Sequence, residues 1–161
     1  MTANYPITVA VRFLRDKNVE FVPHLYDYVE KGGTSESARQ LEVDEHAVVK
    51  TLIFETNEKK PLAVLMHGDR QVSAKNLARH IGMKSVEPAT PERATKYTGY
   101  LVGGTSPFGM RTPMPVYAER SMFEMESIYI NGGKRGFLIE LDPSVLRDVL
   151  KVVEVEVGIA N

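Results

Sequence analysis

Residues 51–66 read TLIFETNEKKPLAVLM, two short apolar runs separated by a polar turn. The runs at 51–55 and 62–66 have the length and composition of β-strands, and residues 57–60 have the polarity of a turn. Strands joined by so short a turn must run antiparallel. The segment therefore predicts a β-hairpin, which favours a mixed sheet over a purely parallel one.

The rest of the chain supplies further strands and several helices with recognisable ends. Ser73 and Thr90-Pro91 are typical of helix starts, and Gly82 and Gly99 of the matching helix ends. Asn131-Gly132 predicts the turn of a second hairpin. Other predicted helices cover residues 6–14, 34–41 (capped by Thr34), 46–49 (capped by Asp44) and 143–151. Other predicted strands cover residues 20–28, 115–118, 127–130, 136–141 and 152–157, and Pro23 indicates that the first of these lies at a sheet edge. We expect one α+β domain over residues 1–161, with helices packed around a mixed, strongly curved, barrel-like sheet.

Composition narrows the classes of function. The 161 residues include 43% hydrophobic and 25% charged residues, as in ordinary globular domains. The absence of cysteine excludes disulfides, a thiol nucleophile and cysteine-bound zinc. No leader or membrane-spanning run is recognisable, so we expect a cytoplasmic protein. The four histidines lack zinc-site spacing, and we expect neither a metal nor a cofactor.

The formal net charge of −1 bears on nucleic-acid binding. General nucleic-acid binders usually have a basic domain. Any contact with nucleic acid must therefore come from a local patch, and it should be sensitive to salt.

Lys50 is the first candidate site residue. Because side chains alternate along a strand, it should share a sheet face with Leu52 and Phe54. An ammonium at the rim of an apolar face needs an anionic partner or access to water. Periodicity alone favours the alternative, in which the stem extends along the apolar surface and the head stays in solvent.

The second candidate is YLVGGTSPFG, residues 100–109, with three glycines and one proline. Successive backbone N–H groups in such a loop can bind an anion or stabilise an oxyanion. The spacing matches neither a P-loop nor a nucleophile elbow. A plain surface turn is the alternative interpretation.

Basic residues form two further candidates. Lys134 and Arg135 follow the predicted hairpin turn and could contact phosphate or protect a sheet edge. Lys75 and Arg79 lie on the helix after Ser73, where a solvated face is the simpler interpretation.

Three motifs together resemble the YbaK/EbsC family of aminoacyl-tRNA deacylases, whose fold also occurs as the editing domain of bacterial prolyl-tRNA synthetases. The resemblance covers nearly the whole chain. The motifs are VVKTLIF at 48–54, YLVGGTSPFG at 100–109 and GGKRG at 132–136.

The resemblance implies a trans-editing hydrolase that deacylates mischarged tRNA, with Cys-tRNA(Pro) as the substrate of the YbaK branch. Water, or the thiol of the substrate itself, would be the nucleophile. Partners would be the acceptor end of the tRNA and prolyl-tRNA synthetase. The alternative is a non-catalytic nucleotide-, anion- or tRNA-binding module that partners a synthetase.

The same resemblance assigns the site residues. Lys50, Gly103 and Gly104 take the catalytic positions, and Gly104→Val should abolish activity with little change in melting temperature. The implied substrate-binding residues are Tyr26, Thr51, Thr105, Ser106, Pro107, Gly109, Lys134 and Arg135.

Overall fold

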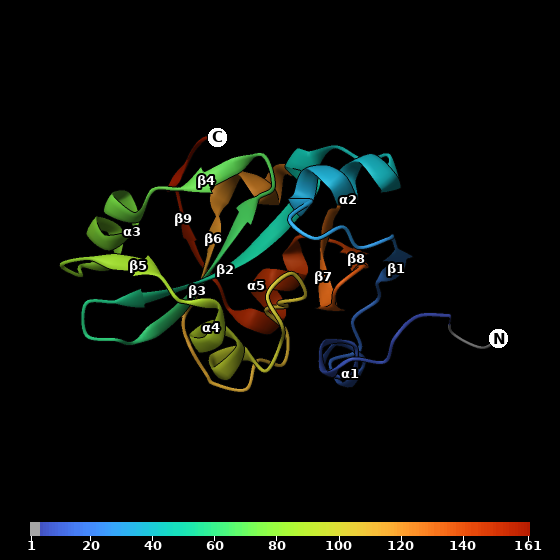
Figure 1. The fold of residues 1–161 in the computed structure, drawn as a ribbon, viewed down its shortest axis with the longest axis horizontal. Coiled ribbons are helices and arrows are strands. Elements are labelled where there is room, and N and C mark those ends of the chain that lie inside the picture. Colours follow the sequence, from blue (N-terminus) through green and yellow to red (C-terminus); the bar gives the residue numbers. More distant parts are fainter. Residues whose placement is uncertain (1–3) are drawn as a thin grey trace.

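The predicted hairpin forms the middle of the sheet in the computed structural model, which describes residues 4–161 (Figure 1). Strand β2 (Val48–Thr56) pairs antiparallel with β3 (Pro61–His67), in a register from Val49 opposite His67 to Glu55 opposite Pro61. Both strands are longer than the sequence predicts. The hairpin prediction is confirmed.

Eight strands form the main sheet, and its path runs β1-β8-β7-β2-β3-β6-β9, with β5 also pairing with β2. Pairings β2–β7, β3–β6 and β6–β9 are parallel and the others are antiparallel. The predicted α+β fold with a mixed sheet is confirmed, but the sheet is open and does not close into a barrel. Strands β4 and β10 form a separate antiparallel pair. The remaining strand bounds are β1 Val22–Leu25, β4 Arg70–Val72, β5 Val86–Pro88, β6 Val116–Glu119, β7 Ile128–Lys134, β8 Phe137–Leu141, β9 Val153–Val155 and β10 Gly158–Ala160.

Helices cover both faces of the sheet. Helices α1 (Val9–Asp16), α4 (Pro91–Thr98) and α5 (Ser144–Leu150) pack on one face and enclose the largest apolar cluster. On the other face, α3 (Ala74–Ile81) packs on Phe54 and Val64, and α2 (Gly33–Leu41) packs on Val48. In Figure 1, α3 and α2 lie at opposite ends of this second face. The segment of β2 between Val48 and Phe54 therefore passes between the two covered areas.

Local cap chemistry explains where several helices begin and end. Two helices begin at predicted hydroxyl caps: Ser73 Oγ accepts the N–H of Asn76 at 3.2 Å, and Thr90 Oγ1 accepts the N–H of Arg93 at 3.3 Å. The same helices end at Gly82 and Gly99, which have positive φ, as predicted. Asp44 caps as predicted, but its helix is a 3₁₀ turn, Glu45–Ala47, that leads directly into β2.

Three local predictions are wrong. Helix α1 begins after Thr8, whose Oγ1 accepts the N–H of Val11, and not at Pro6. Thr34 lies inside α2, and its hydroxyl bonds Glu45 and the Gly68 carbonyl. The second hairpin turns after Lys134, because Asn131-Gly132 continues β7 through a bulge.

The short strands β4, β5 and β10 were not predicted from the sequence. Within residues 4–161, no helix has the length and apolar composition needed to cross a membrane.

Candidate functional site

Lys50 lies on the sheet face between α2 and α3, as its alternation with Leu52 and Phe54 predicts. Its side chain is half-buried, and Nζ donates a hydrogen bond to the Arg70 carbonyl at 2.5 Å. Burial lowers the pKa of Lys50, while the nearby carboxylates of Glu45 and Asp69 act in the opposite direction. No residue adjacent to Lys50 in the sequence predicted this lowered pKa. The ammonium is therefore held at a fixed place on the rim of an apolar face.

Asn131 joins strand β7 to the glycine-rich loop. Val48 of β2 pairs with Tyr129 of β7 and Val49 with Ile130, so side-chain alternation places Asn131 on the same sheet face as Lys50. Asn131 Nδ2 donates to the Gly103 carbonyl at 3.1 Å, and its Oδ1 accepts the N–H groups of Gly133 and Lys134. The structure thus places the lysine and the residue that binds the loop on the same face of two adjacent strands. The sequence predicted only a turn at Asn131, and its bond to the loop was not predicted.

The glycines of the loop are needed for close packing. Gly103 has φ +94°, and a Cβ there would lie 2.9 Å from the Tyr28 hydroxyl oxygen. At Gly104 a Cβ would lie 2.8 Å from the backbone N of Arg135. The loop therefore lies directly against the β7–β8 turn, which requires residues without side chains.

Only part of the loop can reach a ligand. Gly103 is exposed, whereas Ser106, Pro107 and Phe108 are buried. Ser106 Oγ accepts the N–H of Phe108 at 3.2 Å, and the Phe108 carbonyl accepts the Tyr100 hydroxyl at 2.5 Å. These residues anchor the loop, and a substrate contact by Ser106 or Pro107 stays a prediction that their burial does not favour.

Thr105 and Gly109 flank this anchor. Thr105 is half-buried, and its Oγ1 donates a long bond of 3.4 Å to the Leu101 carbonyl. Gly109 has φ +70° and lies against Val9 of α1. Their roles in substrate binding also stay predictions.

The basic pair at the β7–β8 turn divides into two roles. Arg135 Nε donates to the Val102 carbonyl at 3.0 Å, and its guanidinium lies 5.1 Å from the centre of the Tyr28 ring. Arg135 thus fixes the loop. Lys134 is exposed, with no acidic partner among residues 4–161, and is the residue of the pair available for a phosphate.

Tyr26 and Thr51 differ in position. Tyr26 packs beside Val48 and Leu138 on the Lys50 face, and burial raises the pKa of its hydroxyl. It also lines a small hollow of about 230 Å³ with Leu25, Asp27 and Gln40. Thr51 points to the opposite face by strand alternation, and its buried Oγ1 has no hydrogen-bond partner in the described chain. Thr51 and Lys50 therefore cannot direct their side chains at one substrate group.

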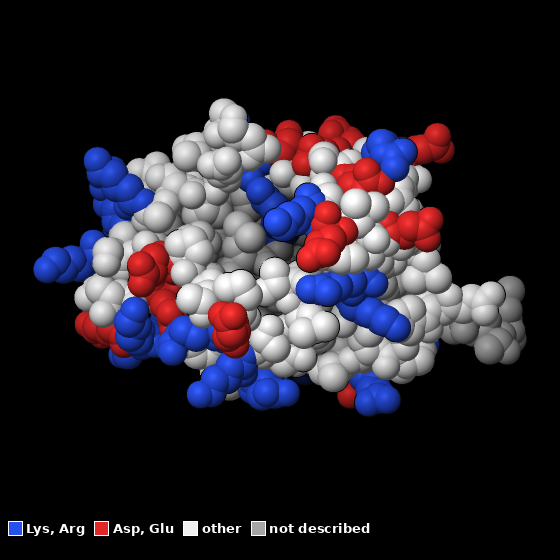
Figure 2. All heavy atoms as spheres, viewed as in Figure 1, with Lys and Arg blue, Asp and Glu red and all other residues white. Residues whose placement is uncertain are grey.

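The charged surface agrees with local rather than general contact with nucleic acid. Figure 2 shows basic and acidic side chains interspersed over one face, which is hollowed near its centre. No continuous basic area covers this view. Lys75 and Arg79 are exposed on α3, at a distance along the same face from the β7–β8 turn.

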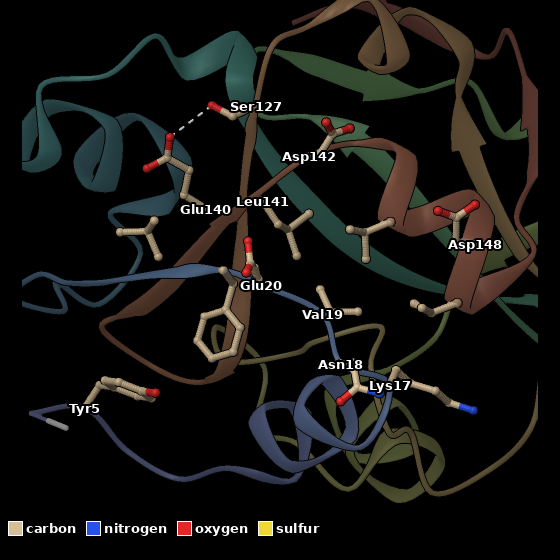
Figure 3. A pocket seen from close by; sticks show the side chains of 14 residues that line it. Tyr5, Lys17, Asn18, Val19, Glu20, Ser127, Glu140, Leu141, Asp142 and Asp148 are labelled. Carbon is tan, nitrogen blue, oxygen red and sulfur yellow. Dashed lines mark hydrogen bonds between the residues drawn. The ribbon is translucent and has the colours of Figure 1, made fainter. Parts of the chain in front are cut away.

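A cavity of about 1030 Å³ lies elsewhere, between α1, β1, β8 and α5 (Figure 3). It contains none of the predicted site residues. Its lining includes the carboxylates of Glu20, Glu140, Asp142 and Asp148, with one basic residue, Lys17. Such a lining repels phosphate, so this cavity is a poor candidate for a tRNA site, and the site at Lys50 and the loop stays a prediction. Among residues 4–161, no three potential metal ligands gather at one point.

Comparison with known proteins identifies the family. The family described as the aminoacyl-tRNA editing domain matches residues 30–149. EbsC of Enterococcus faecalis, whose name assigns it deacylase activity on Cys-tRNA(Pro) and Cys-tRNA(Cys), is 30% identical over 140 residues, which are 86% of this chain and 85% of EbsC. A proline–tRNA ligase of Streptococcus equi subsp. equi is 31% identical over 63% of this chain and 16% of the ligase.

Solved structures show the same fold. The hypothetical protein APE2540 has a TM-score of 0.86 and 23% identity, over 94% of this chain and 99% of its own. A structure described as a trans-editing enzyme for prolyl tRNA synthetase has a TM-score of 0.83 and 21% identity, over 98% of this chain and 100% of its own. The resemblance inferred from the three motifs is thus confirmed, and with it aminoacyl-tRNA editing as the class of function. The chain belongs to the aminoacyl-tRNA editing domain family.

Proposed function

We propose that this protein is a trans-editing deacylase that hydrolyses the ester of mischarged tRNA, with Cys-tRNA(Pro) as its preferred substrate. The observation that carries the proposal is the family match together with the likeness to EbsC over most of both chains. A cytoplasmic location, expected from the sequence, suits a protein that acts on charged tRNA.

The geometry supports a site that positions an ester without supplying a nucleophile. The Gly104 N–H already donates to the Leu101 carbonyl at 2.8 Å. The N–H of exposed Gly103 has no acceptor within residues 4–161. We therefore assign Gly103 as the donor to the ester carbonyl oxygen, and Gly104 as the residue that shapes the turn.

Lys50 would position an anionic or carbonyl group of the aminoacyl-adenosine end, such as the terminal phosphate, through its ammonium. Its bond to the Arg70 carbonyl leaves two ammonium hydrogens for a substrate. Water would then attack the ester, or the thiol of a cysteinyl substrate would cyclise onto it. In either route, the ester C–O bond breaks and the 3′ oxygen of the tRNA leaves with a proton. An aminoacyl ester is already activated, so fixed hydrogen-bond donors can account for most of the catalysis.

Recognition would centre on the acceptor end of the tRNA. The net charge of −1 provides no broad basic surface for a whole tRNA. Exposed Lys134 lies at the turn against which the glycine loop packs, so it would meet a phosphate close to the ester. The relation to part of a proline–tRNA ligase makes prolyl-tRNA synthetase a natural partner for such a domain.

The test is a deacylation panel with cysteinyl-, alanyl- and seryl-tRNA(Pro), each with wild-type protein and the Lys50→Ala variant. Release of cysteine faster than alanine and serine, slowed in the variant, supports the proposal. A binding module would protect all three esters, and protection without turnover would exclude the deacylase. Faster release of alanine or serine would retain the deacylase and change its substrate.

A further inference from the structure

The turn between β3 and β4 lies beside Lys50 and is tied at three places. The Gly68 N–H donates to the Val48 carbonyl at 2.6 Å, and the Gly68 carbonyl accepts the Thr34 hydroxyl at 3.1 Å. The third tie joins His46 Nδ1 to Asp69 Oδ1 at 2.8 Å. Two of these ties use main-chain groups, and the third depends wholly on side chains.

The same turn supplies the acceptor for Lys50. Arg70 follows Asp69 directly, and its carbonyl accepts the Lys50 ammonium at 2.5 Å. A shift of the turn would therefore move the group that fixes Nζ. The carboxylate of Asp69 also favours the charged form of Lys50 through space.

A second histidine holds His46 in place. The rings of His46 and His67 stack with centroids 3.6 Å apart and an interplanar angle of 8°. A carbonyl can only accept, so His67 Nδ1–H donates to the His46 carbonyl at 2.6 Å. His67 Nε2 then accepts the Ser121 hydroxyl at 2.6 Å. With His67 1% exposed, the stack gives His46 a rigid support.

We propose that His46 and Asp69 are positioning residues for the editing reaction: their hydrogen bond fixes the β3–β4 turn, and the turn holds Lys50 toward the substrate. This inference rests on the proposed function for its effect on rate. Its geometric part, that Asp69 controls the environment of Lys50, can be measured without any substrate.

A double-mutant cycle tests the effect on rate. Asp69→Ala should lower the deacylation rate about fivefold when Lys50 is present and by less than about 1.5-fold in the Lys50→Ala background, because coupling disappears when one partner is absent. A purely structural role would lower the rate equally in both backgrounds and would overturn the proposal. His46→Phe, which keeps a ring on His67 but removes Nδ1, should match Asp69→Ala.

Two further variants serve as controls. Asp69→Asn keeps an oxygen for His46 but removes the charge, and it should retain more activity than Asp69→Ala. Glu87→Ala removes another exposed carboxylate, paired with Lys59 at 3.4 Å near the other end of the β2–β3 hairpin, and should leave the rate unchanged.

A substrate-free measurement separates this proposal from the proposed function. In protein labelled at the lysine side-chain carbons, the Lys50 signal is identified by its loss in Lys50→Ala, and its shift is followed with pH. Asp69→Ala should change this signal and lower the pKa of Lys50, because a neighbouring negative charge is lost. An unchanged Lys50 titration overturns the positioning role whatever the activity. A changed titration in a protein inactive on all three substrates supports the positioning role and rejects the deacylase.

Discussion

Gly104→Ala should lower both the melting temperature and the deacylation rate. The φ of Gly104 lies outside the range that only glycine tolerates, so alanine adds no backbone strain there. Its Cβ would lie 2.8 Å from the Arg135 N and 3.0 Å from the Lys134 carbonyl carbon. Both contacts are with backbone, which cannot rotate away. The loop must therefore move off the β7–β8 turn, and Gly103 must move with it.

The size of the effect follows from overpacking. Forcing an extra carbon into a packed site costs about 1–3 kcal/mol. In a domain of this size, each kcal/mol lowers the melting temperature by about 2–4 °C. We expect a decrease of roughly 2–12 °C, and this revises the sequence-based expectation of a nearly unchanged melting temperature for Gly104→Val.

Thermal unfolding and single-turnover deacylation should be measured on the same preparations, with Gly82→Ala as the matched control. Gly82 has φ +73° and open space at its Cβ position, so alanine there costs stability through backbone strain alone, at the end of α3. That control should unfold earlier and keep the wild-type rate. A Gly104→Ala protein with the wild-type melting temperature would refute the packing argument. A lowered melting temperature with a wild-type rate would show that the position of the loop does not matter for turnover.

Three further predictions concern single side chains. Lys50→Ala should slow single-turnover deacylation at least about tenfold, which is about 1.4 kcal/mol of transition-state stabilisation. Lys50→Arg should recover only part of this loss. A wild-type rate for Lys50→Ala would remove Lys50 from the site. Lys134→Ala should weaken binding of the tRNA and reduce the slope of log affinity against log salt by about 0.7, and an unchanged slope in filter binding would exclude a phosphate contact. Burial lowers the pKa of His67 below its ordinary 6.5. Neutral His67 therefore adds its full share to the free energy of unfolding above pH 6.5, and this share is lost as the pH falls from 6.5 toward the lowered pKa. Urea unfolding between pH 7.5 and 5.5 should show this loss, and His67→Gln should reduce it; equal losses in both proteins would assign the effect to other groups.

Features set by neighbouring residues were predictable from the sequence. Ser73 and Thr90 cap their helices because the hydroxyl and the N–H it accepts lie three residues apart. The face of Lys50 followed from the alternation of side chains along one strand.

Features set by distant residues were not predictable. The second hairpin does not turn at Asn131 because the amide of Asn131 bonds Gly103, and Gly132 lies under the ring of Phe137. Thr34 does not cap α2 because Glu45 and Gly68 offer its hydroxyl tertiary partners. The loop glycines suggested ligand contact, but much of their value lies in packing on a turn that only the fold brings near. In each case a side chain had a local role available and took a tertiary one.

The pairing of β2 also sets an order of assembly. Its antiparallel partner β3 is adjacent in sequence, and such a hairpin closes in about 1–10 μs. Its parallel partner β7 lies near the other end of the chain, and long-range parallel pairing is slow. Asn131 and the loop that it binds therefore reach the edge of β2 only after a much longer loop has closed. The hairpin that carries the lysine therefore forms before the groups that complete the site around it. During refolding, protection of the β2 amides against hydrogen exchange should appear before deacylase activity returns.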